Sequence, residues 1–346
     1  MSNRVDKTVL VTGGYGFVGS NLVSHLLQVR PGWKVINVDS ITYAGNPANL
    51  ADLALDPRHA FIKGDIAEPA DMEGVFEKHS PFAVINCAAE THVDRSLDGG
   101  QTFVKTNVLG TQVMLELARS SGARFLQVST DEVYGSLGPD GRFTEDMPLR
   151  PSSPYAATKA AADMLVLAAF CSHGQDVVIT RSSNNYGPYQ FPEKLIPLMV
   201  TNALESQPLP VYGRGENVRD WIHVADHCAG LVAALDRGKS GRVYNLGGGS
   251  EETNLDVVKL ILSMLPQSES EIRYVSDRPG HDFRYALDSR LAWEDLDWQP
   301  RISFREGLLD TVKWYAGRRD WWESVKSGAY QAYYAEHYGT LLRDGQ

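Results

Sequence analysis

Residues 8–19 read TVLVTGGYGFVG, and this stretch decides the fold class. The β-branched run before the glycines is typical of a buried strand, and the residues after them have the apolar spacing of a helix. Gly-x-Gly-x-x-Gly starts at Gly14 and the looser Gly-x-x-Gly-x-x-Gly starts at Gly13, and both patterns end at Gly19. Glycine lets a backbone approach a pyrophosphate closely, and a helix N-terminus offers it amide donors. The strand, loop and helix together therefore predict a dinucleotide-binding site.

Short apolar runs and helix-length segments alternate through the first half of the chain. Strands are predicted at residues 8–12, 34–38, 59–62, 82–85, 124–129 and 176–181. Helices are predicted between them, at residues 20–28, 70–78, 102–120 and 154–171. Strands and helices that alternate at this spacing form a parallel sheet with right-handed crossovers. The predicted fold class is therefore α/β, with a doubly wound parallel sheet of the Rossmann type.

An acidic residue follows the glycine-rich loop at the distance that nucleotide recognition requires. Asp39 ends the second predicted strand, twenty residues after Gly19. A carboxylate there accepts hydrogen bonds from both ribose hydroxyls and repels a 2′-phosphate, so NAD is favoured over NADP as the cofactor. Asp65 and Ile66 end the third strand, where a hydrogen bond and an apolar face can meet an adenine.

The composition changes after about Ser182, where segments rich in proline, glycine and aromatic residues flank a predicted helix. We expect this part to form a smaller C-terminal lobe that binds the substrate. A helix predicted at 224–236 and a strand at 243–246 return the chain to the sheet. The predicted domains are an NAD-binding Rossmann domain of residues 1–182, rejoined by about 224–247, an interleaved substrate-binding lobe of 183–335, and a tail of 336–346.

The composition excludes several classes of protein. The chain has 346 residues, of which 43% are hydrophobic and 22% charged, as in a globular protein of about two domains. Its net charge of −10 disfavours nucleic acid and anionic membranes as partners, because both bind basic surfaces. Cys87, Cys171 and Cys228 form no paired motif, which is typical of reduced thiols. We expect no signal peptide and no membrane span, and therefore a cytoplasmic protein.

A second group of reactive residues follows the fifth predicted strand. Thr130, Asp131 and Glu132 lie where the carboxyl ends of parallel strands form a ligand crevice. Tyr155 and Lys159 are four residues apart in a predicted helix and therefore share a face. A lysine ammonium and a cationic nicotinamide ring nearby would lower the pKa of a tyrosine, whose ordinary value is about 10. Such a pair can shuttle the proton of a carbinol that is being oxidised.

These motifs together resemble the extended short-chain dehydrogenase/reductase family. Further blocks are similar to the dTDP-glucose 4,6-dehydratases within it, and the most specific of them is STDEVYG at residues 129–135. Related epimerases and decarboxylases tend to have Thr-Ser-Glu inside this block. The resemblance extends from about residue 8 to residue 315. The other blocks are AETHVDRS (89–96), SNNYGPY (183–189), PEKLIP (192–197), RDWIHV (219–224) and DRPGHDFRY (277–285).

The resemblance implies a hydro-lyase that converts dTDP-glucose to dTDP-4-keto-6-deoxyglucose with NAD retained between turnovers. Tyr155, supported by Lys159 and bridged by Thr130, would remove the O4 proton while the C4 hydride passes to NAD. Glu132 would then take the C5 proton, Asp131 would protonate the departing 6-hydroxyl, and the hydride would return to C6. Neighbouring strand residues point to opposite faces, so both carboxyl groups can reach one sugar only if the chain turns after Thr130.

The resemblance also implies which residues bind the two ligands. Arg219 and Arg278 are the expected diphosphate ligands, because a guanidinium group suits phosphate oxygens. No metal is expected, because His223, His227 and His281 lack the spacing of metal ligands. The residues expected to bind NAD are Gly13, Gly16, Phe17, Val18, Gly19, Asp39, Ser40, Ile41, Thr42, Asp65, Ile66, Ala88, Ala89, Thr91, Thr106, Tyr155, Lys159 and Asn185. The residues expected to bind the sugar nucleotide are Thr91, His92, Thr130, Asn185, Lys194, Leu195, Pro210, Val211, Tyr212, Arg219, Asn254, Arg278 and His281.

Two departures from the resemblance leave alternatives open. Gln190 stands where a histidine is expected, and Ser40 stands where a lysine is expected beside Asp39. A UDP-linked glucose or glucosamine is therefore an alternative substrate for the same dehydration. A nucleotide-sugar 4-epimerase or a UDP-glucuronate decarboxylase on the same scaffold is a second alternative, which Asp131 disfavours. A non-catalytic NAD-binding protein is a third, which the intact catalytic residues disfavour.

The resemblance further implies the oligomeric state. Family members usually dimerise through two helices of each subunit, which together form a four-helix bundle. The corresponding segments here are the helices predicted at 102–120 and 154–171. We therefore expect a homodimer. The alternative is that both apolar faces are buried within one chain.

Overall fold

The computed structural model describes residues 7–277, 280–326 and 334. Its centre is a seven-stranded sheet with the order β10-β6-β5-β4-β1-β2-β3. Every adjacent pair in this sheet is parallel, so the predicted doubly wound parallel sheet is confirmed. The strands are β1 (Lys7–Thr12), β2 (Trp33–Asp39), β3 (His59–Lys63), β4 (Ala83–Asn86), β5 (Arg124–Thr130), β6 (Val177–Ser182) and β10 (Arg242–Leu246).

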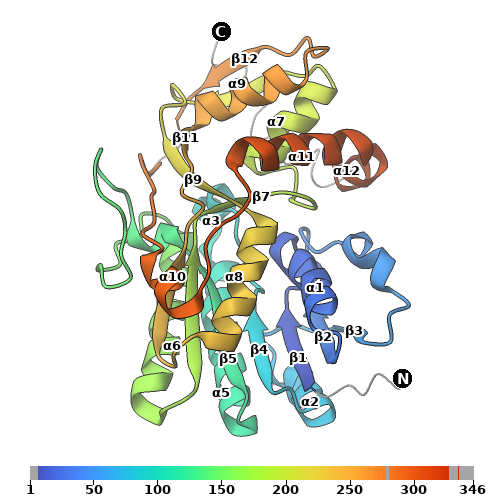
Figure 1. Ribbon diagram of the computed structural model, residues 1–346, viewed down its shortest axis with the longest axis vertical. Coiled ribbons are helices and arrows are strands. Elements are labelled where there is room, and N and C mark those ends of the chain that lie inside the picture. The colour runs from blue at the N-terminus through green and yellow to red at the C-terminus, as the bar shows by residue number, and fades with distance from the viewer. Residues whose placement is uncertain (1–6, 278–279, 327–333, 335–346) are drawn as a thin grey trace.

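Helices cover both faces of this sheet (Figure 1). Val9 and Val11 of β1 point into the core shared with α1 and α8, whereas Leu10 points into the core shared with α2, α5 and α6. Because both faces are buried, the strands read as continuous apolar runs in the sequence. The helices are α1 (Phe17–Val29), α2 (Pro69–His79), α5 (Thr111–Ser121), α6 (Pro154–His173) and α8 (Val224–Arg237), with α3 (Val93–Asp98) and the 3-10 turn η1 (Pro47–Leu53) at the edges.

The helix predicted at 102–120 is interrupted in the structure. It consists of α4 (Gly100–Phe103), a π-helical turn η2 (Val104–Gly110) and α5. Tertiary hydrogen bonds explain the wider turn, because the Asn107 amide donates to the Glu90 carbonyl (3.0 Å) and to the Thr158 hydroxyl (2.9 Å). Gly110 follows, and a Cβ there would lie 2.7 Å from Ile66 Cδ1. Such π turns are frequent at functional sites.

The smaller lobe lies beyond the carboxyl edge of the sheet, at the top of Figure 1. Its core is built from four helices that bury residues such as Met199, Val257, Leu308 and Trp322. The helices are α7 (Leu195–Leu204), α9 (Asn254–Met264), α11 (Phe304–Gly317) and α12 (Arg319–Val325). One small sheet joins β7 (Asn184–Tyr186), β9 (Val218–His223) and β11 (Glu251–Thr253), and another joins β8 (Leu209–Tyr212) and β12 (Ile272–Val275).

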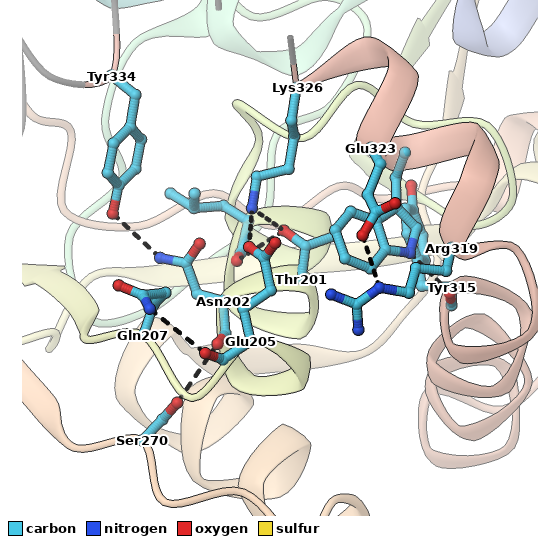
Figure 2. Close-up of polar contacts among 12 residues, drawn as sticks. Thr201, Asn202, Glu205, Gln207, Ser270, Tyr315, Arg319, Glu323, Lys326 and Tyr334 are labelled. Atoms are coloured by element: carbon cyan, nitrogen blue, oxygen red, sulfur yellow. Dashed lines mark hydrogen bonds and ion pairs between the residues drawn. The ribbon is translucent and has the colours of Figure 1, made fainter. Parts of the chain in front are cut away.

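Polar contacts fasten α12 to α7 at the far end of this lobe (Figure 2). The Lys326 ammonium is 2.6 Å from the Glu205 carboxylate and 3.5 Å from the Thr201 hydroxyl. The Asn202 amide donates to the Tyr334 hydroxyl at 3.1 Å. We call these five residues the α7 cluster.

The chain passes between the two lobes more than once. After α7 and β9, α8 and β10 return to the central sheet, where β10 pairs with β6. The helix α10 (Arg290–Leu296) returns again, and its Ala292 and Leu296 join the core that contains α8. The predicted tail, 336–346, lies outside the described residues. Within the described ranges, no helix is both long enough and apolar enough to cross a membrane.

Candidate active site

A crevice of about 440 Å³ opens at the carboxyl edge of the central sheet. The loops after β1, β2, β3, β4, β5 and β6 all contribute to its walls, together with residues of α6 and α8 and of the segment before α7. In open α/β sheets this edge is where ligands bind. The volume is within the usual range of ligand pockets, roughly 300 to 1,000 Å³.

The glycine-rich loop forms one wall of the crevice. Gly13 has a φ of +67°, and a Cβ there would lie 2.7 Å from the Ala88 backbone. At Gly19 a Cβ would lie 2.1 Å from the carbonyl oxygen of Gly13. Both positions therefore require glycine. Gly16 precedes α1 and offers no side-chain cap, so the first-turn amides can hold an anion.

Asp39 lies in the crevice at the end of β2. Its carboxylate accepts hydrogen bonds from the backbone amides of Tyr15 (2.9 Å) and Ile41 (2.7 Å). Burial raises the pKa of Asp39, and these two hydrogen bonds oppose that shift. A carboxylate has about four acceptor positions, so two remain for the hydroxyls of a ribose. The loop and Asp39 together fit a dinucleotide without a 2′-phosphate.

The chain turns at the end of β5, which brings two acidic residues to one side. β5 ends at Thr130, and Asp131–Tyr134 form the 3-10 turn η3. The Thr130 hydroxyl caps this turn by accepting a hydrogen bond from the Glu132 amide at 3.3 Å. Asp131 and Glu132 consequently both line the crevice. The turn closes at Gly135, whose φ is +85°.

The surroundings of Asp131 favour the protonated form of its carboxyl group. Burial raises the pKa of Asp131 well above its ordinary value, and the negative charges of Glu132 and Asp220 raise it further. The guanidinium of Arg219 opposes this shift, with a smaller effect. The side chain is therefore protonated under conditions where an exposed aspartate has lost its proton.

The first turns of α6 carry Tyr155 and Lys159 in the crevice wall. The Lys159 ammonium donates to the Val128 carbonyl at 2.7 Å, which fixes it beneath β5. Burial raises the pKa of Tyr155 well above 10, the charge of Glu132 adds to this, and a hydrogen bond with Thr130 opposes it. The lowered tyrosine pKa is expected with a cationic nicotinamide ring in the crevice, and for that state it stays a prediction; in the chain by itself burial outweighs the favourable contact with Thr130.

A buried ion pair supports the catalytic helix from behind. Asp163 lies one turn after Lys159, and its carboxylate is 2.9 Å from the Arg181 guanidinium, with both side chains fully buried. The charge of Asp163 raises the pKa of Lys159, against burial, which lowers it. Arg181 also donates to the Tyr134 hydroxyl at 2.8 Å, so the pair connects α6 to the turn that holds Asp131.

The crevice brings together most of the residues predicted from the sequence. All those predicted to bind NAD line it except Ile41, and so do all five predicted catalytic residues. Of the residues predicted to bind the sugar nucleotide, four line it: Thr91, Thr130, Asn185 and Lys194. Arg278 lies outside the described residues. The remainder lie outside the crevice walls: His92, Leu195, Pro210, Val211, Tyr212, Arg219, Asn254 and His281.

One of the remaining residues, Arg219, interacts electrostatically with the acidic turn. The Arg219 guanidinium donates to the Asp282 carbonyl at 2.9 Å and lies 4.5 Å from the ring centre of Tyr285. Because its charge acts on Asp131, Arg219 lies near this carboxyl group. The rings of Tyr212 and His281 meet edge to face at 6.1 Å.

The sequence interpretation gave no site role to several buried polar residues of the crevice wall, among them Glu193 and His227. The Glu193 carboxylate accepts a hydrogen bond from the Tyr43 hydroxyl (3.0 Å) and lies 3.7 Å from the His92 ring, so His92 contacts Glu193. Glu193 belongs to the PEKLIP block, and its neighbour Lys194 was the only charged residue singled out there. For His227 the sequence carries no comparable signal.

Comparison with known proteins decides the family. The family model described as GDP-mannose 4,6 dehydratase matches residues 10–311. A dTDP-glucose 4,6-dehydratase of Xanthomonas campestris is 48% identical over 343 residues, which covers 94% of this chain and 97% of that protein. The chain belongs to the dTDP-glucose 4,6-dehydratase family. Solved structures of this family agree with the assignment.

The dTDP-glucose 4,6-dehydratase of Streptomyces venezuelae, solved with NAD bound, superposes with a TM-score of 0.88 at 47% identity, over 92% of this chain and 100% of that one. The dTDP-glucose 4,6-dehydratase of Bacillus anthracis, in complex with NAD, gives a TM-score of 0.87 at 46% identity, with the same coverage.

Proposed function

We propose that this chain is an NAD-dependent dTDP-glucose 4,6-dehydratase, a hydro-lyase that forms dTDP-4-keto-6-deoxyglucose. The observation that carries the proposal is the buried Asp131, with its raised pKa, next to Glu132 in the same crevice as Tyr155 and Lys159. A 4-epimerase needs a single acid–base group at C4, whereas a 4,6-dehydratase also needs a base for C5 and an acid for the 6-hydroxyl. Relatives with NAD bound support the choice of cofactor.

Each reactive side chain has a role that fits its environment. NAD, when bound, supplies the hydride acceptor for C4 and the hydride donor for C6. Tyr155 acts as a phenolate, which the Lys159 ammonium stabilises, and it becomes a neutral phenol when it takes the O4 proton. The 4-keto group makes the C5 proton acidic, and Glu132 removes it. Asp131 gives its proton to the 6-hydroxyl, which leaves as water.

The smaller lobe supplies the recognition of the sugar nucleotide in this proposal. Lys194 lines the crevice, and its ammonium donates to the Thr91 carbonyl at 2.9 Å. Arg219 lies beside Asp131 and suits a diphosphate oxygen. The identity with dTDP-glucose 4,6-dehydratases over most of the chain supports thymine as the base. A UDP-linked sugar is the alternative substrate, and it uses the same chemistry.

The direct test is incubation of the purified protein with dTDP-glucose and, separately, with UDP-glucose. We expect dTDP-glucose to lose the mass of one water, with no net consumption of NAD. Water loss from the UDP sugar alone would keep the chemistry and change the substrate. No water loss from either, with a C4 epimer or carbon dioxide formed from another sugar nucleotide, would contradict the roles of Asp131 and Glu132.

We further propose a homodimer through η2, α5 and α6. Large apolar side chains are exposed on these segments, with Val104 52%, Leu109 49% and Met164 48% exposed. Exposed apolar groups of this size on adjoining helices are typical of an interface. The three cysteines form no disulfide, which fits a reducing cytoplasm, where we place the enzyme.

The interface can be tested by charge insertion. Val104→Asp combined with Met164→Asp should give a monomer by light scattering, whereas the wild type gives a dimer. Leu55→Asp is the matched control, because Leu55 is 96% exposed and far along the chain from these segments. A wild-type protein that scatters light as a monomer at micromolar concentration would contradict the dimer.

A further inference from the structure

His227 is a buried polar residue of the crevice wall that the reaction scheme does not use. It lies in the first turn of α8, and the residue is 1% exposed. Its side chain borders the same crevice as the glycine-rich loop and the catalytic residues. Among the described residues, neither ring nitrogen has a hydrogen-bond partner. This arrangement differs from that of His223, four residues earlier, whose ring accepts a hydrogen bond from the Ala225 amide at 3.2 Å.

Two unpaired polar atoms on one buried ring are unfavourable for the fold. Each buried donor or acceptor without a partner costs roughly 1–3 kcal/mol. Ionisation does not relieve this cost, because burial lowers the pKa of His227 to about 3. The ring is therefore neutral, with one N–H donor and one nitrogen acceptor. A group that enters the crevice and reaches the ring can satisfy at least one of them.

The position of α8 shows which part of a dinucleotide this group belongs to. α8 packs against α1 and against β5, β6 and β7. Next to His227, the Cys228 sulfur is 4.0 Å from the Val18 carbonyl in the first turn of α1. Asp39 and Asp65, which suit the adenosine half, follow β2 and β3 on the other side of the glycine-rich loop. His227 therefore faces the half of the cofactor that contains the diphosphate and the nicotinamide ribose.

We propose that His227 is a further cofactor-binding residue, which hydrogen-bonds NAD from the α8 side and holds it between turnovers. The phosphate oxygens accept from the ring N–H, and a ribose hydroxyl can donate to the other ring nitrogen. The inference rests on the proposed function, because it requires NAD in this crevice. It adds a contact from α8, which follows the first part of the smaller lobe. NAD is then held by α8 as well as by the glycine-rich loop.

The test compares three variants of the full chain. His227→Leu removes both polar atoms and keeps a similar volume, and His227→Asn keeps a donor and an acceptor. His223→Asn is the control at the N-cap of the same helix. The readouts are the NAD released per chain after purification, the dissociation constant for added NAD, and the melting temperature with and without NAD. We expect His227→Leu to weaken NAD binding by at least about tenfold, His227→Asn to restore part of it, and His223→Asn to leave it unchanged.

The melting temperatures separate a binding role from a structural one. If His227 binds NAD, His227→Leu leaves the melting temperature of the NAD-free protein unchanged or raises it, and the gain on adding NAD shrinks. Unchanged NAD affinity in His227→Leu would overturn the inference, as would an equal loss of melting temperature with and without NAD. A wild type that binds no NAD would instead overturn the proposed function itself.

Discussion

The α7 cluster and the crevice use polar side chains in opposite ways. In the α7 cluster, Lys326 meets Glu205 and Asn202 meets Tyr334, so the polar groups satisfy one another (Figure 2). In the crevice wall, by contrast, polar atoms of several buried side chains have no hydrogen-bond partner among the described residues: Ser129, Asp131, Asn184, Asn185, Gln190 and His227. Paired groups stabilise a fold, whereas unpaired buried groups lower its stability and await a ligand. Other unpaired buried polar atoms lie outside the crevice, for example on Asn37 and Asn254, so the contrast describes these two regions and is not by itself a marker of function.

The comparison predicts that changes in the crevice alter activity more than stability. The largest effect is expected for Tyr155→Phe, which removes the hydroxyl that we propose as the base for the O4 proton. Dehydration of dTDP-glucose should fall by about 10³-fold, since positioned acid–base groups contribute roughly 10²- to 10⁴-fold. The measurement is product formation by mass spectrometry. A melting temperature several degrees lower would mean that Tyr155 has a structural role, and a matching loss of NAD binding would assign the effect to the cofactor.

A smaller effect is expected for Asp131→Asn, which keeps the shape of the acid and removes its proton. Water elimination should fall by about 10²-fold, because the 6-hydroxyl then leaves without a proton donor. In the wild type, activity should decline as the pH rises through the raised pKa of Asp131, because the active form is protonated. A pH profile of the variant that keeps this decline would assign it to another group.

Asp131→Asn should also be more stable than the wild type, because it removes a carboxyl group whose burial in the crevice is unfavourable. The pKa of Asp131 is raised in the folded protein above 3.8, so the unfolded chain loses this proton first. The wild type therefore loses stability as the pH rises from about 3.8 to the folded pKa, and Asp131→Asn does not. Urea unfolding at several pH values should show an advantage for the variant that grows with pH over this window. No advantage at neutral pH would show that burial of Asp131 carries no cost.

The smallest effect is expected in the α7 cluster. Lys326→Met removes an ion pair whose side chains are 14% and 28% exposed. We expect the free energy of unfolding to fall by about 1 kcal/mol, near the upper end for partly exposed pairs. The turnover of dTDP-glucose and the NAD content should not change. A drop in activity without a drop in stability would contradict the expectation that the α7 cluster contributes to stability and not to activity.

The sequence was sufficient for the parts of the molecule that depend on local pattern. The sheet follows from apolar runs that are buried on both faces, and the cofactor loop follows from glycines at fixed spacing. The π turn at η2 was not predictable, because hydrogen bonds of Asn107 to distant residues produce it. His227 was not predictable either, because its distinguishing property is the lack of a partner for its ring within the described part of the chain.

The pKa of Tyr155 in the chain by itself was not predictable for a related reason. The spacing of Tyr155 and Lys159 predicts that they share a helix face, and both do line the crevice. Spacing carries no information on how deeply the pair is buried, and burial dominates both pKa shifts. The electrostatic properties of a site therefore depend on tertiary packing, whereas the residues that line the site can be predicted from motifs.

The path of the chain sets the order in which the enzyme is completed during synthesis. The central sheet gains its edge strand β10 only when residue 246 has been made, after most of the first part of the smaller lobe. The α8 wall of the crevice, with His227, also comes late. A nascent chain on the ribosome therefore has the glycine-rich loop long before it has a closed cofactor site. For the same reason, exchange of the smaller lobe between relatives requires more than one junction in the gene.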